Sequence, residues 1–211
     1  GFTEGFYGKP RVDWELLERY HEGLIALSAC LAGQLPRLLL AGDYPGAKAH
    51  AETMRDLFGE GNYYLELQDH GIPQQKQVIQ GLVKLHQETG IPLVATNDAH
   101  YLTRQDAVLQ DVLMCIQMGK TVEDPSRMRF ETPEFYLKSE QEMAALFPHW
   151  PEAIENTAKI ADACSVDFQF GVYHLPEFKL PEGRTDADAY FEELCRQGFA
   201  RRYPQGSADY E

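Results

Sequence analysis

The chain has 211 residues, of which 33 are acidic and 19 basic, and its formal net charge is −14. Because contacts with phosphate groups need lysine and arginine, this charge argues against a free-standing nucleic-acid-binding module. It leaves open a role inside a larger protein whose basic surface lies elsewhere. The hydrophobic share of 44% is typical of a globular protein with a real core. No apolar run approaches the roughly 20 residues that cross a bilayer, so we expect no membrane association.

The cysteine pattern and the first residues indicate the cytoplasm. The four cysteines are far apart and form no CxxC pair, and they are Cys30, Cys115, Cys164 and Cys195. Without a secretory signal, such cysteines are expected to be reduced thiols, and the last three fall within helical patterns that predict core positions. Residues 1–10 are not basic and then apolar, as a signal peptide would be. The sequence lacks an initiator methionine, so we expect a segment of a longer protein.

Strand-like and helix-like segments alternate over the first part of the chain. Short apolar runs predict three strands, at 24–28, 63–67 and 92–96. Amphipathic segments around them predict helices at 12–20, 34–41, 45–58, 74–88 and 105–118. This alternation indicates βαβ units and a mainly parallel sheet or barrel, so the expected fold class is α/β.

The pattern changes after about Lys120, where the strand-like runs stop. Ser139 is suited to cap a helix, and Pro151 is suited to the first turn of the next one. Residues 166–183 are irregular and rich in aromatic residues and proline. The helices expected in this part are 140–147, 151–163 and 187–203.

Potential metal ligands follow each of the three predicted strands. Cys30 follows the first strand, Asp69 and His70 the second, and Asp98 and His100 the third. In barrels and open α/β sheets, active sites are built at the carboxyl ends of the strands. Asp98 and His100 are two residues apart, so in extended chain their side chains point to the same side and can reach one metal. A carboxylate beside an imidazole suits zinc, manganese or iron.

Each of these residues also has an ordinary structural interpretation. Asp98 is equally suited to cap the following helix, with His100 as a loop residue. A lone cysteine such as Cys30 is more often a small buried hydrophobe than a ligand. Glu66 lies within a strand, where we expect it to neutralise a helix end or a lysine. His70 is expected at the surface of a loop or behind a metal ligand, rather than on the metal.

Three common catalytic or phosphate-binding motifs are missing from the sequence. It contains no GxxxxGK[ST] loop, no GxGxxG after a strand and no GxSxG elbow. It therefore gives no support to nucleotide binding by those loops or to a serine hydrolase.

Five segments together resemble the alpha subunits of bacterial DNA polymerase III, the C-family replicative polymerases. They are Gly5–Arg11, Tyr20–Gly33, Tyr63–Gly71, Ile91–Tyr101 and Arg129–Lys138. The resemblance extends through His174–Phe178 to the last predicted helix. It implies that residues 1–150 are the later part of a PHP (polymerase and histidinol phosphatase) domain. Residues 151–211 would then start the polymerase core, in a mostly helical segment that opens the palm and thumb region.

The resemblance also implies a metal site. PHP domains of this family are distorted (β/α)7 barrels with a cleft that holds two or three metals. Positions that match Cys30, Asp98 and His100 are ligands in members with an intact site. The implied metals are zinc or manganese, with iron as an alternative, and magnesium serves the polymerase. The family's HxHxxxS-type motif and the palm carboxylates match positions outside this sequence, so we expect the chain alone to be neither a competent polymerase nor a competent nuclease.

The implied function is part of a DNA-directed DNA polymerase, a nucleotidyltransferase of chromosome replication. The PHP domain would add 3′–5′ exonuclease or phosphoesterase chemistry, or would be structural. The implied partners of the whole protein are DNA, dNTPs, the sliding clamp and the clamp loader. One alternative is a stand-alone phosphoesterase of the histidinol-phosphatase type, against which the polymerase-like residues 151–211 argue. Another is a non-catalytic scaffold or interaction module, which the acidic surface suits.

Overall fold

A computed structural model describes residues 4–206 of the chain. The chain divides into two compact units, the first ending at Ser165 and the second beginning at Val166. None of the described helices is long and apolar enough to cross a membrane.

A parallel sheet lies at the centre of the first unit. Its strands, in spatial order, are β1 (Ala26–Leu27), β2 (Tyr63–Leu67) and β3 (Leu93–Ala95). Leu65 of β2 pairs with Leu93 of β3 in the parallel register, and both side chains are fully buried. Strands covered on both faces have continuous apolar runs, which is why the sequence predicts them well. The three predicted strands are confirmed, although β1 and β3 are shorter than expected.

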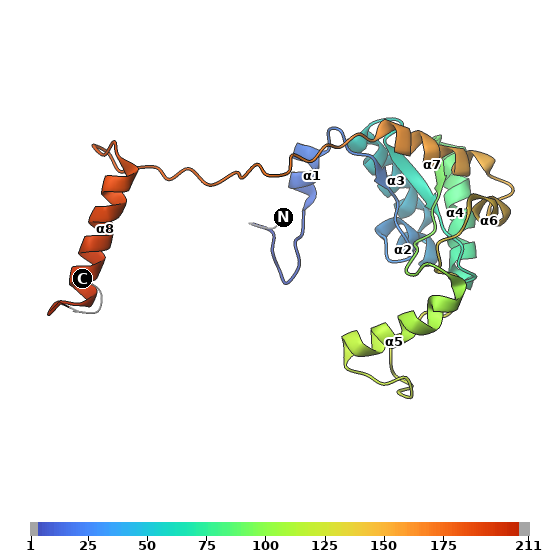
Figure 1. Cartoon of the computed structure of the whole chain (residues 1–211). Helices are drawn as coiled ribbons and strands as arrows, with labels where there is room; N and C mark the ends of the chain where they lie inside the picture. The colour runs from blue at the N-terminus through green and yellow to red at the C-terminus, as the bar shows by residue number, and fades with distance from the viewer. Residues whose placement is uncertain (1–3, 207–211) are drawn as a thin grey trace. The chain divides into compact units, whose positions relative to one another are not determined.

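Helices precede, connect and follow these strands, and not all of them lie on the sheet (Figure 1). They are α1 (Trp14–Tyr20), α2 (Gln34–Leu40), α3 (Tyr44–Phe58), α4 (Pro73–Thr89), the 3-10 helix η1 (Arg104–Asp106), α5 (Ala107–Met118), α6 (Glu140–Leu146) and α7 (Pro151–Ala163). The predicted helices are confirmed to within two residues at each end, except that the predicted helix at 105–118 starts as the 3-10 turn η1. Ser139 caps α6 by accepting a hydrogen bond from the Glu142 backbone N. Gly90 ends α4 in the left-handed region with φ 73°.

The core lies between the sheet and the helices α2, α3, α4 and α7. Its largest buried side chains include Leu35, Leu39, Phe58, Tyr63, Leu82, Leu85, Ile91 and Phe147. Gly81 lies where α4 approaches α2, and a methyl group on it would lie 2.8 Å from Leu39 Cδ2. The missing side chain therefore allows the two helices to pack closely.

Helix α7 packs on β3 and belongs with the sheet. The buried Asn156 of α7 donates from Nδ2 to the Leu93 carbonyl oxygen at 2.7 Å. Since β3 is at one end of the three-stranded order, this bond satisfies a carbonyl on the outer side of the sheet. The first compact unit thus includes α7 and extends beyond residue 150. The assignment of residues 151–211 to the polymerase core stays a prediction.

The second unit contains the helix α8 (Ala187–Arg202), preceded by an irregular segment as predicted. Cys195 in α8 and Cys164 at the end of α7 are exposed, so the prediction that they lie in the core is wrong. Cys115 is buried, as predicted, and all four cysteines are free thiols. Helical periodicity shows which residues share a face, but it does not show whether another element covers that face.

Candidate functional site

The loops that follow the three strands lie at one edge of the sheet, because the strands are parallel. Two non-glycine residues in these loops have a positive φ, Ala29 with 67° and Asp98 with 46°. This conformation is uncommon for a residue with a Cβ and persists where surrounding contacts hold it. Asp98 is itself a ligand predicted from the sequence, and Ala29 directly precedes another, Cys30.

Glu66 holds the loop after β1. Its Oε2 accepts a hydrogen bond from the Ala29 backbone N at 3.0 Å, and its own backbone N donates to Ser28 Oγ at 2.8 Å. Its Oε1 accepts hydrogen bonds from the Thr96 hydroxyl and from Gln68 Nε2. Glu66 therefore links the loops after β1 and β3. The expectation that it would neutralise a helix end or a lysine is wrong, because loops distant in the sequence supply its partners.

His70 is 1% exposed, so the prediction of a surface loop position is wrong. Its ring stacks on that of Phe135, with centroids 4.1 Å apart. The His70 backbone N donates to Gln75 Oε1 at 2.7 Å, which fixes the orientation of that amide, and Gln75 Nε2 donates to His70 Nδ1 at 2.8 Å. Since Nδ1 accepts, the ring proton is on Nε2, which donates to the Asn97 carbonyl oxygen. A buried neutral imidazole thus holds the start of the loop after β3.

The segment 132–138 holds the same loop from its other side. The Asn97 side chain donates from Nδ2 to the Tyr136 carbonyl oxygen at 2.6 Å and accepts from Lys138 Nζ at 3.3 Å. The His100 backbone N donates to the Phe135 carbonyl oxygen at 2.7 Å. The Lys138 side chain is 3% exposed, and its burial lowers the pKa of the ammonium group. Contacts between residues about 40 positions apart in the sequence therefore fix the backbone of the loop that carries the predicted ligands Asp98 and His100.

Asp98 and His100 lie together at the accessible edge of this loop. His100 Nε2 is 3.3 Å from Asp98 Oδ1, and the side chains are 38% and 39% exposed. The His100 ring also contacts Phe130, with centroids 4.8 Å apart. A carboxylate oxygen and an imidazole nitrogen in contact at the surface are a donor set that fits part of a divalent metal shell.

Cys30 lies in different surroundings. It is partly buried in a small hollow lined mainly by apolar side chains, including Leu31, Pro36, Val78 and Ile79. Among residues 4–206, no group of three or more histidine, cysteine or carboxylate side chains is placed to hold a metal. The structure therefore brings together two of the three predicted ligands, and the role of Cys30 as a ligand stays a prediction.

Sequence reasoning missed the residues that support this loop. Gln75 lies on α4 and Lys138 lies beyond α5, and neither has a pattern that marks it as a partner of the loop. Asn97 is the exception, because its position directly after a predicted strand indicates that it belongs to the loop of the site. Its backbone and side chain both take part, the former with His70 and the latter with Lys138.

Comparison with known proteins identifies the family. The model of the PHP domain family matches residues 1–70. DNA polymerase III subunit alpha of Treponema pallidum (strain Nichols) is 47% identical over 216 residues, which cover 100% of this chain and 18% of the relative. The corresponding subunit of Borreliella burgdorferi is 45% identical and that of Thermus aquaticus 44%, each over 96% of this chain and 18% and 17% of the relative. The chain belongs to the DNA polymerase III alpha subunit family.

The match confirms the family inferred from the sequence, and the structure confirms an α/β fold with a small parallel sheet. The chain spans about 18% of the length of the curated relatives that it matches. The loops of the candidate site lie on the aligned part, since the matches cover nearly the whole chain.

Proposed function

We propose that the chain is part of a replicative DNA-directed DNA polymerase. The identity to DNA polymerase III alpha subunits along nearly its whole length supports this function. The whole protein would add deoxynucleotides from dNTPs to a DNA strand, with magnesium at carboxylates that this chain does not supply. It would work in the cytoplasm with the sliding clamp and the clamp loader. The relatives reported above are polymerase subunits, which favours this function over a stand-alone phosphoesterase.

The first unit would supply consecutive βα units of the distorted (β/α)7 barrel of a PHP domain. Two observations support this arrangement: the strands are parallel, and their spatial order follows the sequence order. The segment 151–211 would lead from the barrel into the palm and thumb region of the polymerase core.

At the carboxyl edge of the sheet, Asp98 and His100 would hold a divalent metal, zinc or manganese with iron as the third choice. The observation that carries this proposal is the 3.3 Å contact between Asp98 Oδ1 and His100 Nε2 on a loop held from both sides. Cys30 would be a further ligand, as thiolate. A bound metal would lower the pKa of a water molecule and neutralise phosphate charge during 3′–5′ phosphodiester hydrolysis. Because the imidazole must be neutral and the carboxyl group ionised, metal binding would weaken in acid.

The test compares Asp98→Ala with Asp56→Ala in the full-length protein. Asp56 is an exposed carboxylate on α3 and serves as the matched control. We expect Asp98→Ala to lose bound metal and 3′–5′ exonuclease activity while polymerase activity stays at the level of the control. Unchanged metal content and exonuclease activity in Asp98→Ala would refute the metal site.

A structural role of this domain is the second candidate. The apolar hollow around Cys30 favours it, because a cysteine in such surroundings acts as a small hydrophobe. In that case Asp98→Ala would change the stability of the domain without changing hydrolysis, and Cys30→Ala would leave the metal content unchanged.

A further inference from the structure

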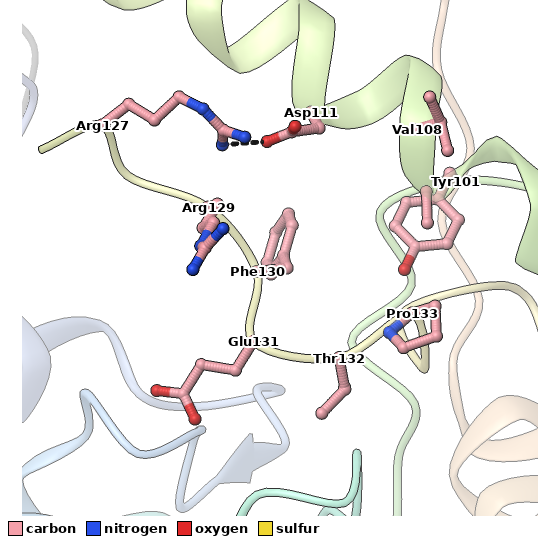
Figure 2. Close-up of a pocket in the computed structure, with 10 residues that line it drawn as sticks. Tyr101, Val108, Asp111, Arg127, Arg129, Phe130, Glu131, Thr132 and Pro133 are labelled. Atoms are coloured by element: carbon pink, nitrogen blue, oxygen red, sulfur yellow. Dashed lines mark hydrogen bonds and ion pairs between the residues drawn. The ribbon is translucent and has the colours of Figure 1, made fainter. Parts of the chain in front are cut away.

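A pocket of about 280 Å³ adjoins the Asp98–His100 pair. The loop after β3, the start of α5 and the segment 127–133 line it, and the side chains that matter here are Tyr101, Asp111, Arg127, Arg129, Phe130 and Glu131 (Figure 2). Two of these connect it to the candidate metal ligands. Tyr101 follows His100 in the chain, and the ring of Phe130 contacts the ring of His100.

The two arginines of the pocket differ in their partners. Arg127 is fixed, because its guanidinium lies 2.5 Å from Asp111 Oδ1 and its Nε donates to the Val122 carbonyl oxygen at 3.0 Å. Its side chain is only 10% exposed. Arg129 is exposed and has no partner among the residues that the structure describes. Its planar guanidinium is therefore available to an anion, and such a group binds phosphate oxygens with two parallel hydrogen bonds.

The other side of the pocket is aromatic. Phe130 is partly buried between the His100 ring and the pocket. The Tyr101 hydroxyl accepts a hydrogen bond from the Phe135 backbone N at 3.3 Å, so its own proton is left to donate to a ligand. An aromatic surface near a free arginine is the combination by which proteins hold a nucleotide of single-stranded nucleic acid, with the base stacked and the phosphate paired.

We propose that this pocket binds one nucleotide of a DNA strand, with its phosphate at Arg129 and its base against Phe130 and Tyr101. The volume is near the lower end of small-molecule sites, which suits a single nucleotide rather than a duplex. The inference rests on the proposed function in placing a strand end beside Asp98 and His100. The Glu131 carboxylate also lines the pocket and opposes the phosphate, so its charge weakens the binding.

A protection experiment on the full-length protein tests the site without any catalysis. Phenylglyoxal modifies free arginines, and peptide mass spectrometry gives the rate for Arg129 separately. Modification is followed in EDTA with dTMP, oligothymidylate, thymidine or inorganic phosphate. We expect dTMP and oligothymidylate to slow the modification of Arg129 several-fold, thymidine to have no effect and phosphate to protect more weakly than dTMP. Arg37 on α2 is the control, since it is exposed and its side chain has no partner among the described residues.

Variants separate the contributions of base and phosphate. In Phe130→Ala, dTMP should protect Arg129 from modification no better than inorganic phosphate does. In Glu131→Gln, dTMP should protect Arg129 more strongly than in the parent protein. Arg129→Ala should raise the KM of single-strand hydrolysis about tenfold with little change in kcat, as expected for loss of one charge-assisted contact. Equal modification of Arg129 with and without dTMP would overturn the proposal. Protection by dTMP but not by oligothymidylate would overturn the assignment to a DNA strand.

This experiment and the metal test fail independently. Protection in EDTA needs neither Asp98 nor a metal, so it should persist in Asp98→Ala. If Asp98→Ala keeps its exonuclease activity while Arg129 is still protected, the proposed hydrolysis fails and the nucleotide site stands. If Arg129 is not protected while Asp98→Ala loses the activity, the nucleotide site fails alone.

Discussion

The buried pair His70 and Gln75 offers a direct test of how the loop before Asp98 is held. In His70→Phe the ring volume and the stacking on Phe135 remain, but the Gln75 amide and the Asn97 carbonyl oxygen lose their partner. Each buried polar group without a partner costs about 1–3 kcal/mol, so we expect the free energy of unfolding to fall by about 2–4 kcal/mol.

Gln75→Leu should cost a similar amount, because it leaves the backbone N and Nδ1 of His70 without partners. In the double variant both groups of the side-chain hydrogen bond, Gln75 Nε2 and His70 Nδ1, are removed, so neither is left without a partner. Its loss should therefore be smaller than the sum of the two single losses by about 1–2 kcal/mol, within the range of coupling energies for residues in contact.

Urea unfolding followed by far-ultraviolet circular dichroism measures all four proteins of this cycle. The comparison requires a constant m-value, which shows that the surface exposed on unfolding is unchanged. Strictly additive losses would refute the hydrogen-bonded pair, and so would a His70→Phe variant with the stability of the parent.

Three further predictions concern the helices around the sheet. Replacing Asn156 by leucine leaves the strand carbonyl that it satisfies without a donor, and should lower the free energy of unfolding in urea by about 1–3 kcal/mol. Leu82→Ala in the core should cost about 2–5 kcal/mol, whereas Leu109→Ala on the exposed face of α5 should change the stability by less than about 0.5 kcal/mol. The hydrogen bond from Tyr136 and those from the capping serine lower the pKa of Glu142 from 4.5 to about 2. The stabilisation is thus complete above pH 4.5 and lost as the pH falls towards 2, and Glu142→Gln should remove this part of the pH dependence of the melting temperature.

The sequence alone determined the features that depend on near neighbours. Strand and helix positions follow from the period of apolar residues, and Ser139, Pro151 and Gly90 fix three of the helix ends. Asp98 and His100 were expected to lie together as residues i and i+2 of extended chain, and they are in contact, although Asp98 has a positive φ of 46° and is not extended. The family followed from the order of five segments along the chain.

The tertiary structure decided which loops meet and which helix faces are covered. Glu66 takes its partners from loops 37 and 30 residues away, and Lys138 binds an asparagine 41 residues away. The burial of His70 depends on stacking against Phe135, which lies after α5 in the sequence. The physical reason is that a local pattern encodes which side of an element is apolar, whereas the partner of a polar side chain is set by the sum of many small packing free energies over the whole unit.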